Sequence, residues 1–153
     1  MMIPTKISKR IVADKVEWIN KMLDEISYLP MDSFESFVSD KRNIFAAESC
    51  LRRALEALMD LGRHILAKGF AKGVSEYKEI GRLLGQMGVL PTPAALKFKQ
   101  LAGYRNRMVH FYHEITDKEL YSICSSQLSE IKELVDDLLA WLKSNPRFLD
   151  GTL

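Results

Sequence analysis

The segment of residues 103–112, GYRNRMVHFY, gathers side chains that could act on a phosphodiester bond. A histidine imidazole takes up and releases protons near neutral pH, and an arginine guanidinium binds a phosphate through parallel N–H groups. RNA cleavage without a metal ion needs both: an acid or base for the 2′-hydroxyl or the leaving 5′-oxygen, and a cation for the phosphate. Arg105 and His110 are therefore the candidate catalytic residues, and Asn106 could support them by orienting the phosphate or the imidazole.

An ideal helix over residues 94–115 would divide this segment into two faces. The predicted core stripe is Leu101, Tyr104, Met108, Phe111 and Ile115. The sector turned away from it holds Arg105, Asn106, His110, Tyr112 and His113. At about 100° per residue Arg105 and Tyr112 are nearly eclipsed, whereas Arg105 and His110 diverge by roughly 140°. The side chains of Arg105 and His110 could still come together in three ways: because the arginine side chain is long, because the helix is kinked, or because two protomers form a dimer. The alternative is a solvated face without function, because such residues are common on exposed helices.

The charge of the chain is unevenly distributed. Its net charge is +2, but residues 80–113 contain no aspartate or glutamate. The cations of that stretch are Arg82, Lys97, Lys99, Arg105 and Arg107, which leaves a net charge of −3 on the remainder. A local cationic segment on a mildly acidic body is expected of a phosphate-binding protein, although charges that are merely solvated would give the same pattern.

Helical periodicity runs through almost the whole chain. Apolar residues recur three and four positions apart and predict long helices over about residues 12–26, 44–65, 94–115 and 116–142. Gly62 indicates a close helix–helix approach, Ser75 is predicted to cap a shorter helix with Tyr77 facing inward, and Thr116 and Glu119 have the spacing of a capping box. No stretch alternates with period two. We therefore expect an all-α, up-and-down four-helix bundle with one or two additional short helices, in a single domain over residues 1–153.

Composition places the protein in the soluble globular class. Hydrophobic residues make up 47% of the chain and charged residues 27%, which excludes a disordered chain. Cys50 and Cys124 lie in apolar helical patterns without a CxxC motif, as expected of core thiols in a reducing compartment. No signal-peptide pattern and no run of roughly 18 apolar residues is present, so we expect a cytoplasmic protein without a membrane segment.

Residues 104–115, YRNRMVHFYHEI, resemble the Rx4HxY signature of the HepT toxins of the HEPN superfamily. Arg105, His110 and Tyr112 stand at the three signature positions. The segments AAESCLRRALEALMDLGRHILAKG and SEYKEIGRLLGQMGVLP are also similar to the family in order and spacing, so the resemblance covers roughly residues 10–142.

The resemblance implies a ribonuclease toxin that acts on tRNA or mRNA without a cofactor or metal. It implies a homodimer in which two Rx4H motifs face each other across a composite active-site cleft. It also implies an MntA-like nucleotidyltransferase antitoxin that transfers AMP onto Tyr112. An adenylate there would place an anion beside Arg105 and pair with its guanidinium.

Two alternatives stay open beside the ribonuclease. The first is a non-catalytic HEPN module that serves as partner or acceptor protein of a nucleotidyltransferase; the pairing of Arg105 with His110 favours the enzyme. The second is a metal-dependent bundle, for which His110 and His113, three residues apart, are a weak signal because a di-iron bundle needs Glu-x-x-His on two helices. His64 is interpreted as structural, and Arg52 and Arg53 as a solvated pair that could extend an RNA surface.

Overall fold

The structure is a computed structural model that describes residues 4–111 and 114–153, in which seven α-helices are joined by short loops and no strand occurs. The helices are α1 (Lys9–Ser27), α2 (Phe34–Val38), α3 (Lys41–Phe70), α4 (Tyr77–Gln86), α5 (Thr92–His110), α6 (Asp117–Ser126) and α7 (Leu128–Ser144). A short 3-10 helix, Pro146–Phe148, follows α7. No helix in these ranges is long and apolar enough to cross a membrane.

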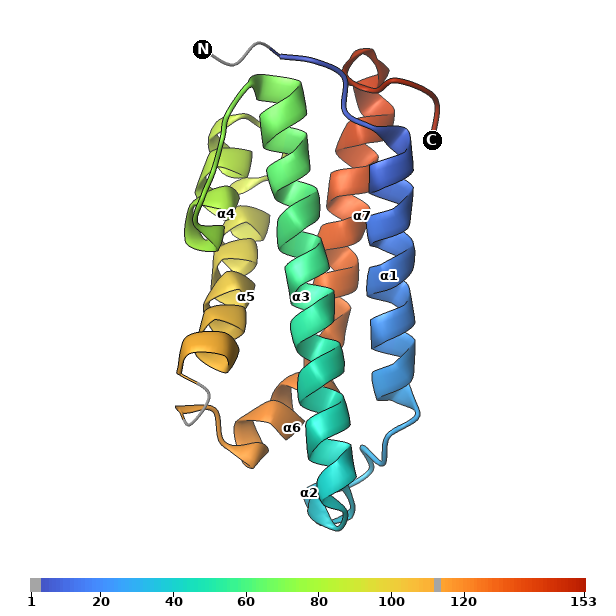
Figure 1. The fold of residues 1–153 in the computed structure, drawn as a ribbon, viewed down its shortest axis with the longest axis vertical. Coiled ribbons are helices and arrows are strands. Elements are labelled where there is room, and N and C mark those ends of the chain that lie inside the picture. The colour runs from blue at the N-terminus through green and yellow to red at the C-terminus, as the bar shows by residue number, and fades with distance from the viewer. Residues whose placement is uncertain (1–3, 112–113) are drawn as a thin grey trace.

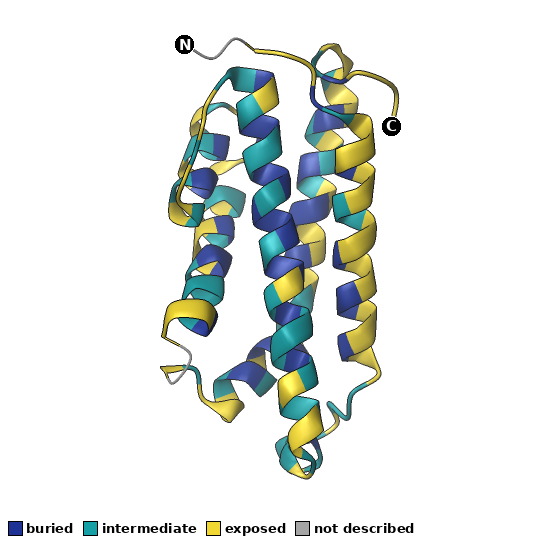
Figure 2. Ribbon diagram, in the orientation of Figure 1, coloured by how far each residue is buried: buried dark blue, intermediate teal, exposed yellow. Residues whose placement is uncertain are grey.

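The long helices α1, α3, α5 and α7 form the predicted up-and-down bundle (Figure 1). The 30-residue helix α3 is its centre, because it contacts α1, α2, α4, α5, α6 and α7. Each long helix turns a buried stripe toward the interior, and its outer face is exposed (Figure 2). The amphipathic periodicity of the sequence therefore predicted the fold class and the centres of the long helices.

The last predicted helix is interrupted. Residues 116–142 form α6 and α7, which meet at Gln127, a residue with φ −117° and ψ 3°. The side chain of Thr116 accepts the N–H of Glu119 and caps α6 as predicted. Serines precede the break, and Ser126 donates its hydroxyl to the carbonyl of Ser122. Such side-chain bonds compete with the helical ladder and favour a bend, which continuous apolar periodicity does not reveal.

Two other predicted boundaries were also wrong. Helix α4 begins at Tyr77 after Glu76, and Ser75 does not cap it; the carbonyl of Ser75 instead accepts a hydrogen bond from Arg63. Helix α5 ends at His110 rather than at residue 115, and Phe111, predicted to be core, is half exposed. Arg107 binds the carbonyl of Glu114 and the carboxylate of Glu119, so this arginine connects α5 to Glu114 and to α6.

Gly62 allows the close approach of α4 and α5 to α3. A Cβ atom added there would lie 2.8 Å from Cγ2 of Ile80 and 2.9 Å from Cζ of Phe98, closer than real side chains come. The predicted role of this glycine is confirmed. Because α5 carries Arg105 and α4 begins at Tyr77, the small residue sets how near these side chains lie to α3.

His64 ties the start of α1 to α3. Its Nε2 accepts the backbone N–H of Ser8, and Ser8 is the N-cap residue of α1. Partial burial lowers the pKa of this imidazole, and the nearby charge of Lys68 lowers it further. An accepting Nε2 requires the neutral ring, so the structural interpretation of His64 agrees with its contacts. The two cysteines are free thiols, and burial raises the pKa of Cys124 to about 12.

Candidate active site

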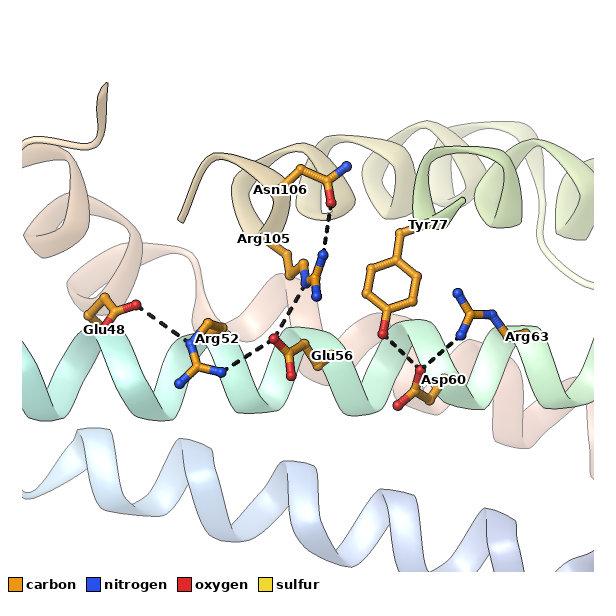
Figure 3. A network of polar contacts seen from close by, with 8 residues as sticks. All are labelled: Glu48, Arg52, Glu56, Asp60, Arg63, Tyr77, Arg105 and Asn106. Atoms are coloured by element: carbon orange, nitrogen blue, oxygen red, sulfur yellow. Dashed lines mark hydrogen bonds and ion pairs between the residues drawn. The ribbon is translucent and has the colours of Figure 1, made fainter. Parts of the chain in front are cut away.

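Arg105 lies between α5 and α3, not on an outer face. Only 20% of its side chain is exposed. Its Nε donates to Oε1 of Glu56 on α3 at 3.4 Å, and its Nη1 donates to Oδ1 of Asn106 at 3.3 Å (Figure 3). The alternative of a merely solvated arginine does not fit this position, because α3 and the start of α4 cover that side of α5. Both hydrogen bonds are long, so neither holds the guanidinium tightly.

Tyr77, the first residue of α4, stands beside Arg105. The guanidinium carbon of Arg105 is 4.6 Å from the centroid of the Tyr77 ring, and that of Arg63 is 4.7 Å from it. The tyrosine hydroxyl donates to Oδ1 of Asp60 at 2.9 Å. Burial, and then the hydrogen bond to Asp60, raise the pKa of Tyr77, so the hydroxyl stays protonated near neutral pH. The ring faces inward, as predicted, but its partners include two arginines.

Charged side chains on α3 complete this network (Figure 3). Their positions, four or three residues apart, are Glu48, Arg52, Glu56, Asp60 and Arg63. Arg52 pairs with Glu48 and Glu56, and Arg63 pairs with Asp60. Arg52 is thus bound within the chain rather than freely solvated. Sequence reasoning missed Glu56 and Asp60, although their spacing on the polar face of the second long helix was a signal that could have found them.

Asn106 and His110 line a hollow of about 310 Å³ with Glu76, Lys78 and Phe111. His110 is the last residue of α5 and is exposed to solvent. Arg105 does not line this hollow, and within the described ranges no hydrogen bond joins Arg105 to His110. The two candidate catalytic residues are connected through Asn106, which bonds the first and shares a hollow with the second. The predicted modification site, Tyr112, and also His113 lie outside the described residues.

The cationic segment is largely neutralised by the fold. Four of its cations pair with carboxylates from outside residues 80–113; the pairs are Arg82–Glu79, Lys97–Glu130, Arg105–Glu56 and Arg107–Glu119. The sequence left open whether these charges bind phosphate or are merely solvated; in the structure Glu79 of the same helix pairs with Arg82, and α3, α6 and α7 supply the carboxylates for the other three cations. Exposure of a cation cannot be inferred from local charge alone.

Comparisons with known proteins agree in one family. The family model described as "Ribonuclease HepT-like" matches residues 19–138. A protein of Aphanizomenon flos-aquae named tRNA nuclease HepT is 25% identical over 140 residues, which cover 90% of this chain and 94% of that protein.

Solved structures share the fold. A tri-AMPylated HEPN toxin of Shewanella oneidensis, solved in complex with its MNT antitoxin, is 22% identical with a TM-score of 0.76 and covers 85% of this chain and 97% of its own. YutE of Bacillus subtilis, a cytosolic protein of unknown function, is 18% identical with a TM-score of 0.72 and covers 92% of this chain and 94% of its own. The family match over most of the chain and the shared helical fold show that this protein belongs to the HepT-like ribonuclease family.

Proposed function

We propose that this protein is a metal-independent endoribonuclease and the toxin of a HepT/MntA-like toxin–antitoxin pair. The observation that carries the proposal is the connection of Arg105, through Asn106, to the hollow that His110 lines, in a chain of the HepT-like ribonuclease family. The name of the Aphanizomenon flos-aquae relative, tRNA nuclease HepT, supports tRNA as the first substrate to test, with mRNA as the other.

The proposed reaction is an internal transfer at the RNA phosphate. The 2′-hydroxyl gives its proton to a base and its oxygen attacks the phosphorus. The bond to the 5′-oxygen then breaks, and that oxygen takes a proton from an acid. The products are a 2′,3′-cyclic phosphate and a 5′-hydroxyl end. His110 acts as the base or the acid, and Arg105 stabilises the charge that grows on the phosphate oxygens.

The geometry of Arg105 suits binding of a phosphate. A guanidinium carries five N–H donors, and its contacts with Glu56 and Asn106 are both long. An RNA phosphate can therefore compete for the remaining donors without breaking a strong hydrogen bond. Asn106 keeps its amide N–H groups for the phosphate or the imidazole, since its oxygen is the atom that meets Arg105.

We further propose that Tyr112 is the residue modified by a nucleotidyltransferase antitoxin. The similar Shewanella oneidensis toxin is AMPylated and bound to an MNT antitoxin, and another similar structure is a toxin–antitoxin with AMP-PNP. Tyr112 follows His110 by two residues. An adenylate on its hydroxyl would bring a phosphodiester anion close to the RNA-binding residues and compete with the substrate phosphate.

A tRNA cleavage assay in EDTA tests the enzyme. The unmodified wild-type protein should cleave tRNA and leave cyclic phosphate ends, and His110→Ala should lose activity by at least about 100-fold. Val109→Ala is the matched control, because it shortens the neighbouring exposed side chain and leaves every polar group in place. Cleavage by His110→Ala at the wild-type rate would contradict the assignment of His110 as the catalytic acid or base.

Intact mass after co-expression with the nucleotidyltransferase tests the second half of the proposal. Added adenylate mass should coincide with loss of cleavage, and Tyr112→Phe should receive no adenylate on this residue and stay active. If unmodified wild-type protein leaves tRNA and mRNA intact while it still binds the nucleotidyltransferase, the protein is the acceptor module considered above and not a ribonuclease.

A further inference from the structure

We propose that Tyr77 is the positioning residue for the catalytic guanidinium of Arg105. The proposal rests on the ribonuclease function proposed above. The tyrosine does not belong to the Rx4HxY motif; it stands 28 positions before Arg105 and begins a different helix. Its ring acts on the arginine, and the arginine acts on the RNA phosphate.

The ring stands between two guanidinium groups. Arg105 approaches from one side at 4.6 Å from the ring centroid, and Arg63 lies on the other side at 4.7 Å (Figure 3). Both distances are within the range of a cation–π contact. Each cation also pairs with a carboxylate of α3, since Glu56 bonds Arg105 and Asp60 pairs with Arg63. The two like charges are thus separated by the ring, and each lies beside a carboxylate that it shares with another cation, Arg52 at Glu56 and Lys15 at Asp60.

The tyrosine itself is fixed at its far end. Its hydroxyl donates to Asp60 at 2.9 Å, which is shorter than the two side-chain hydrogen bonds of Arg105, at 3.4 and 3.3 Å. Asp60 also pairs with Arg63 and with Lys15 on α1. The aspartate therefore connects the ring to α3 and α1, and its hydrogen bond holds the ring in place beside the arginine.

Contact with an aromatic ring suits a catalytic arginine better than a strong ion pair would. A ring fixes the place of the guanidinium but takes none of its N–H donors, so these stay available for the phosphate. A short bidentate carboxylate would hold the group equally well but would occupy the donors. Because the hydrogen bonds of Arg105 to Glu56 and Asn106 are long, the contact with the ring of Tyr77 is the one that can hold the guanidinium in place before RNA binds.

Cleavage kinetics of Tyr77 variants test the proposal. Tyr77→Phe keeps the ring and its contact with Arg105 but loses the bond to Asp60, so its kcat should fall less than that of Tyr77→Leu and stay within about threefold of the wild-type value. Tyr77→Leu removes the ring and should lower kcat roughly 10- to 100-fold, because catalysis depends on exact placement of the charge, while KM stays within about threefold since many phosphates share RNA binding.

Tyr121→Leu is the matched control. It also removes a half-buried ring and one tyrosine hydrogen bond, to the carbonyl of Met31 at 2.9 Å, but at a place where its ring meets Phe34 and Phe37. We expect both leucine variants to lower the melting temperature and only Tyr77→Leu to lower kcat. A wild-type kcat in Tyr77→Leu, an equal loss in Tyr121→Leu, or a loss in Tyr77→Phe as large as in Tyr77→Leu would overturn the proposal.

A measurement without RNA separates failure of this inference from failure of the proposed function. In a 15N NMR spectrum, the Nε–H resonance of Arg105, assigned by its absence in Arg105→Lys, should be shifted by the ring current of Tyr77. The shift should persist in Tyr77→Phe and vanish in Tyr77→Leu. If wild-type protein cleaves no RNA, the ribonuclease proposal fails, and this resonance still decides whether Tyr77 orders the guanidinium. An unshifted wild-type resonance overturns the positioning role.

Discussion

At position 105, a lysine would keep the charge of the side chain but lose the planar fork of donors. The ammonium group cannot place two parallel N–H groups on a phosphate, nor reproduce simultaneous contact with Glu56, Asn106 and the ring of Tyr77. We therefore expect Arg105→Lys to lower kcat by roughly 100- to 1,000-fold, the usual effect of losing one transition-state donor. Single-turnover cleavage of tRNA measures this rate.

Thermal unfolding is the control for the Arg105 variant. The residue is partly exposed and its ion pair with Glu56 is long, so its replacement by lysine should change the melting temperature little. A variant that folds normally and keeps more than a third of wild-type activity would show that positive charge alone suffices, and would contradict the role given to the fork.

The residues of the Rx4H motif could be predicted from the sequence, whereas the residues that contact them from other helices could not. Arg105, Asn106 and His110 lie within six residues, and their types indicate their chemistry. Glu56 is 49 positions away from Arg105, and Tyr77 reaches it from another helix. Such contacts depend on how α3, α4 and α5 pack, and periodicity predicts which face of each helix is buried but not which polar residues meet across the seam.

Helix packing around α3 offers a test with two glycines in opposite situations. A Cβ at Gly62 would collide with Ile80 and Phe98, whereas a Cβ at Gly103, within α5, would meet nothing within 4 Å. Alanine is the better helix former by about 1 kcal/mol. Gly103→Ala should therefore stabilise the protein by about 1 kcal/mol, and Gly62→Ala should destabilise it by about 1 kcal/mol or more, because overpacking outweighs propensity.

Chemical denaturation with both variants measures the difference. The midpoints should move in opposite directions, with the slope of the transition unchanged. If Gly62→Ala stabilises the protein as much as Gly103→Ala does, then α4 and α5 can move outward without cost. The role of Gly62 in setting the distance between Arg105 and α3 would then be wrong.

Element boundaries were harder to predict than the elements. The bundle follows from apolar spacing because each long helix needs one buried stripe. The ends of α5 and α6 cannot be predicted in this way, because no glycine or proline marks them and the apolar periodicity continues through both. Arg107 of α5 contacts Glu114 and Glu119, and these contacts are tertiary.

The link between α1 and α3 should make stability depend on pH. The folded protein holds the pKa of His64 below its unfolded value of about 6.5, because partial burial disfavours the charged ring. The unfolded state therefore binds more protons, and this contribution to stability is present above about pH 6.5 and is lost as pH falls through the lower, folded pKa. Wild-type melting temperature should decrease from pH 7.5 to pH 5.

His64→Gln isolates this effect, because glutamine offers an acceptor for the Ser8 N–H and does not titrate. The melting temperature of the variant should decrease less than that of the wild type over the same pH interval. All other titratable groups contribute to the pH dependence equally in both proteins. Parallel melting curves of the two proteins across the interval would mean that His64 does not titrate differently on folding.

At the scale of the whole molecule, the separation of Arg105 from His110 raises the question of which chain completes each site. Within one chain Arg105 turns toward α3 and the ring of Tyr77, whereas His110 lies at the exposed end of α5. A homodimer with two Rx4H motifs facing each other, as the family resemblance implies, would let the arginine of one protomer act with the histidine of its partner.

Mixing two inactive variants tests this arrangement. In a mixed dimer of Arg105→Ala with His110→Ala, one site would lose both residues and the other would keep both if the sites are shared between protomers. Random reassortment should then restore roughly a quarter of wild-type activity, because half of the dimers are mixed and each has one intact site. Sites formed within single chains would give no recovery, since each chain lacks one residue. Recovery only after subunit exchange, with light scattering showing a dimer throughout, would establish the shared cleft; a monomer, or an inactive mixed dimer, would rule it out.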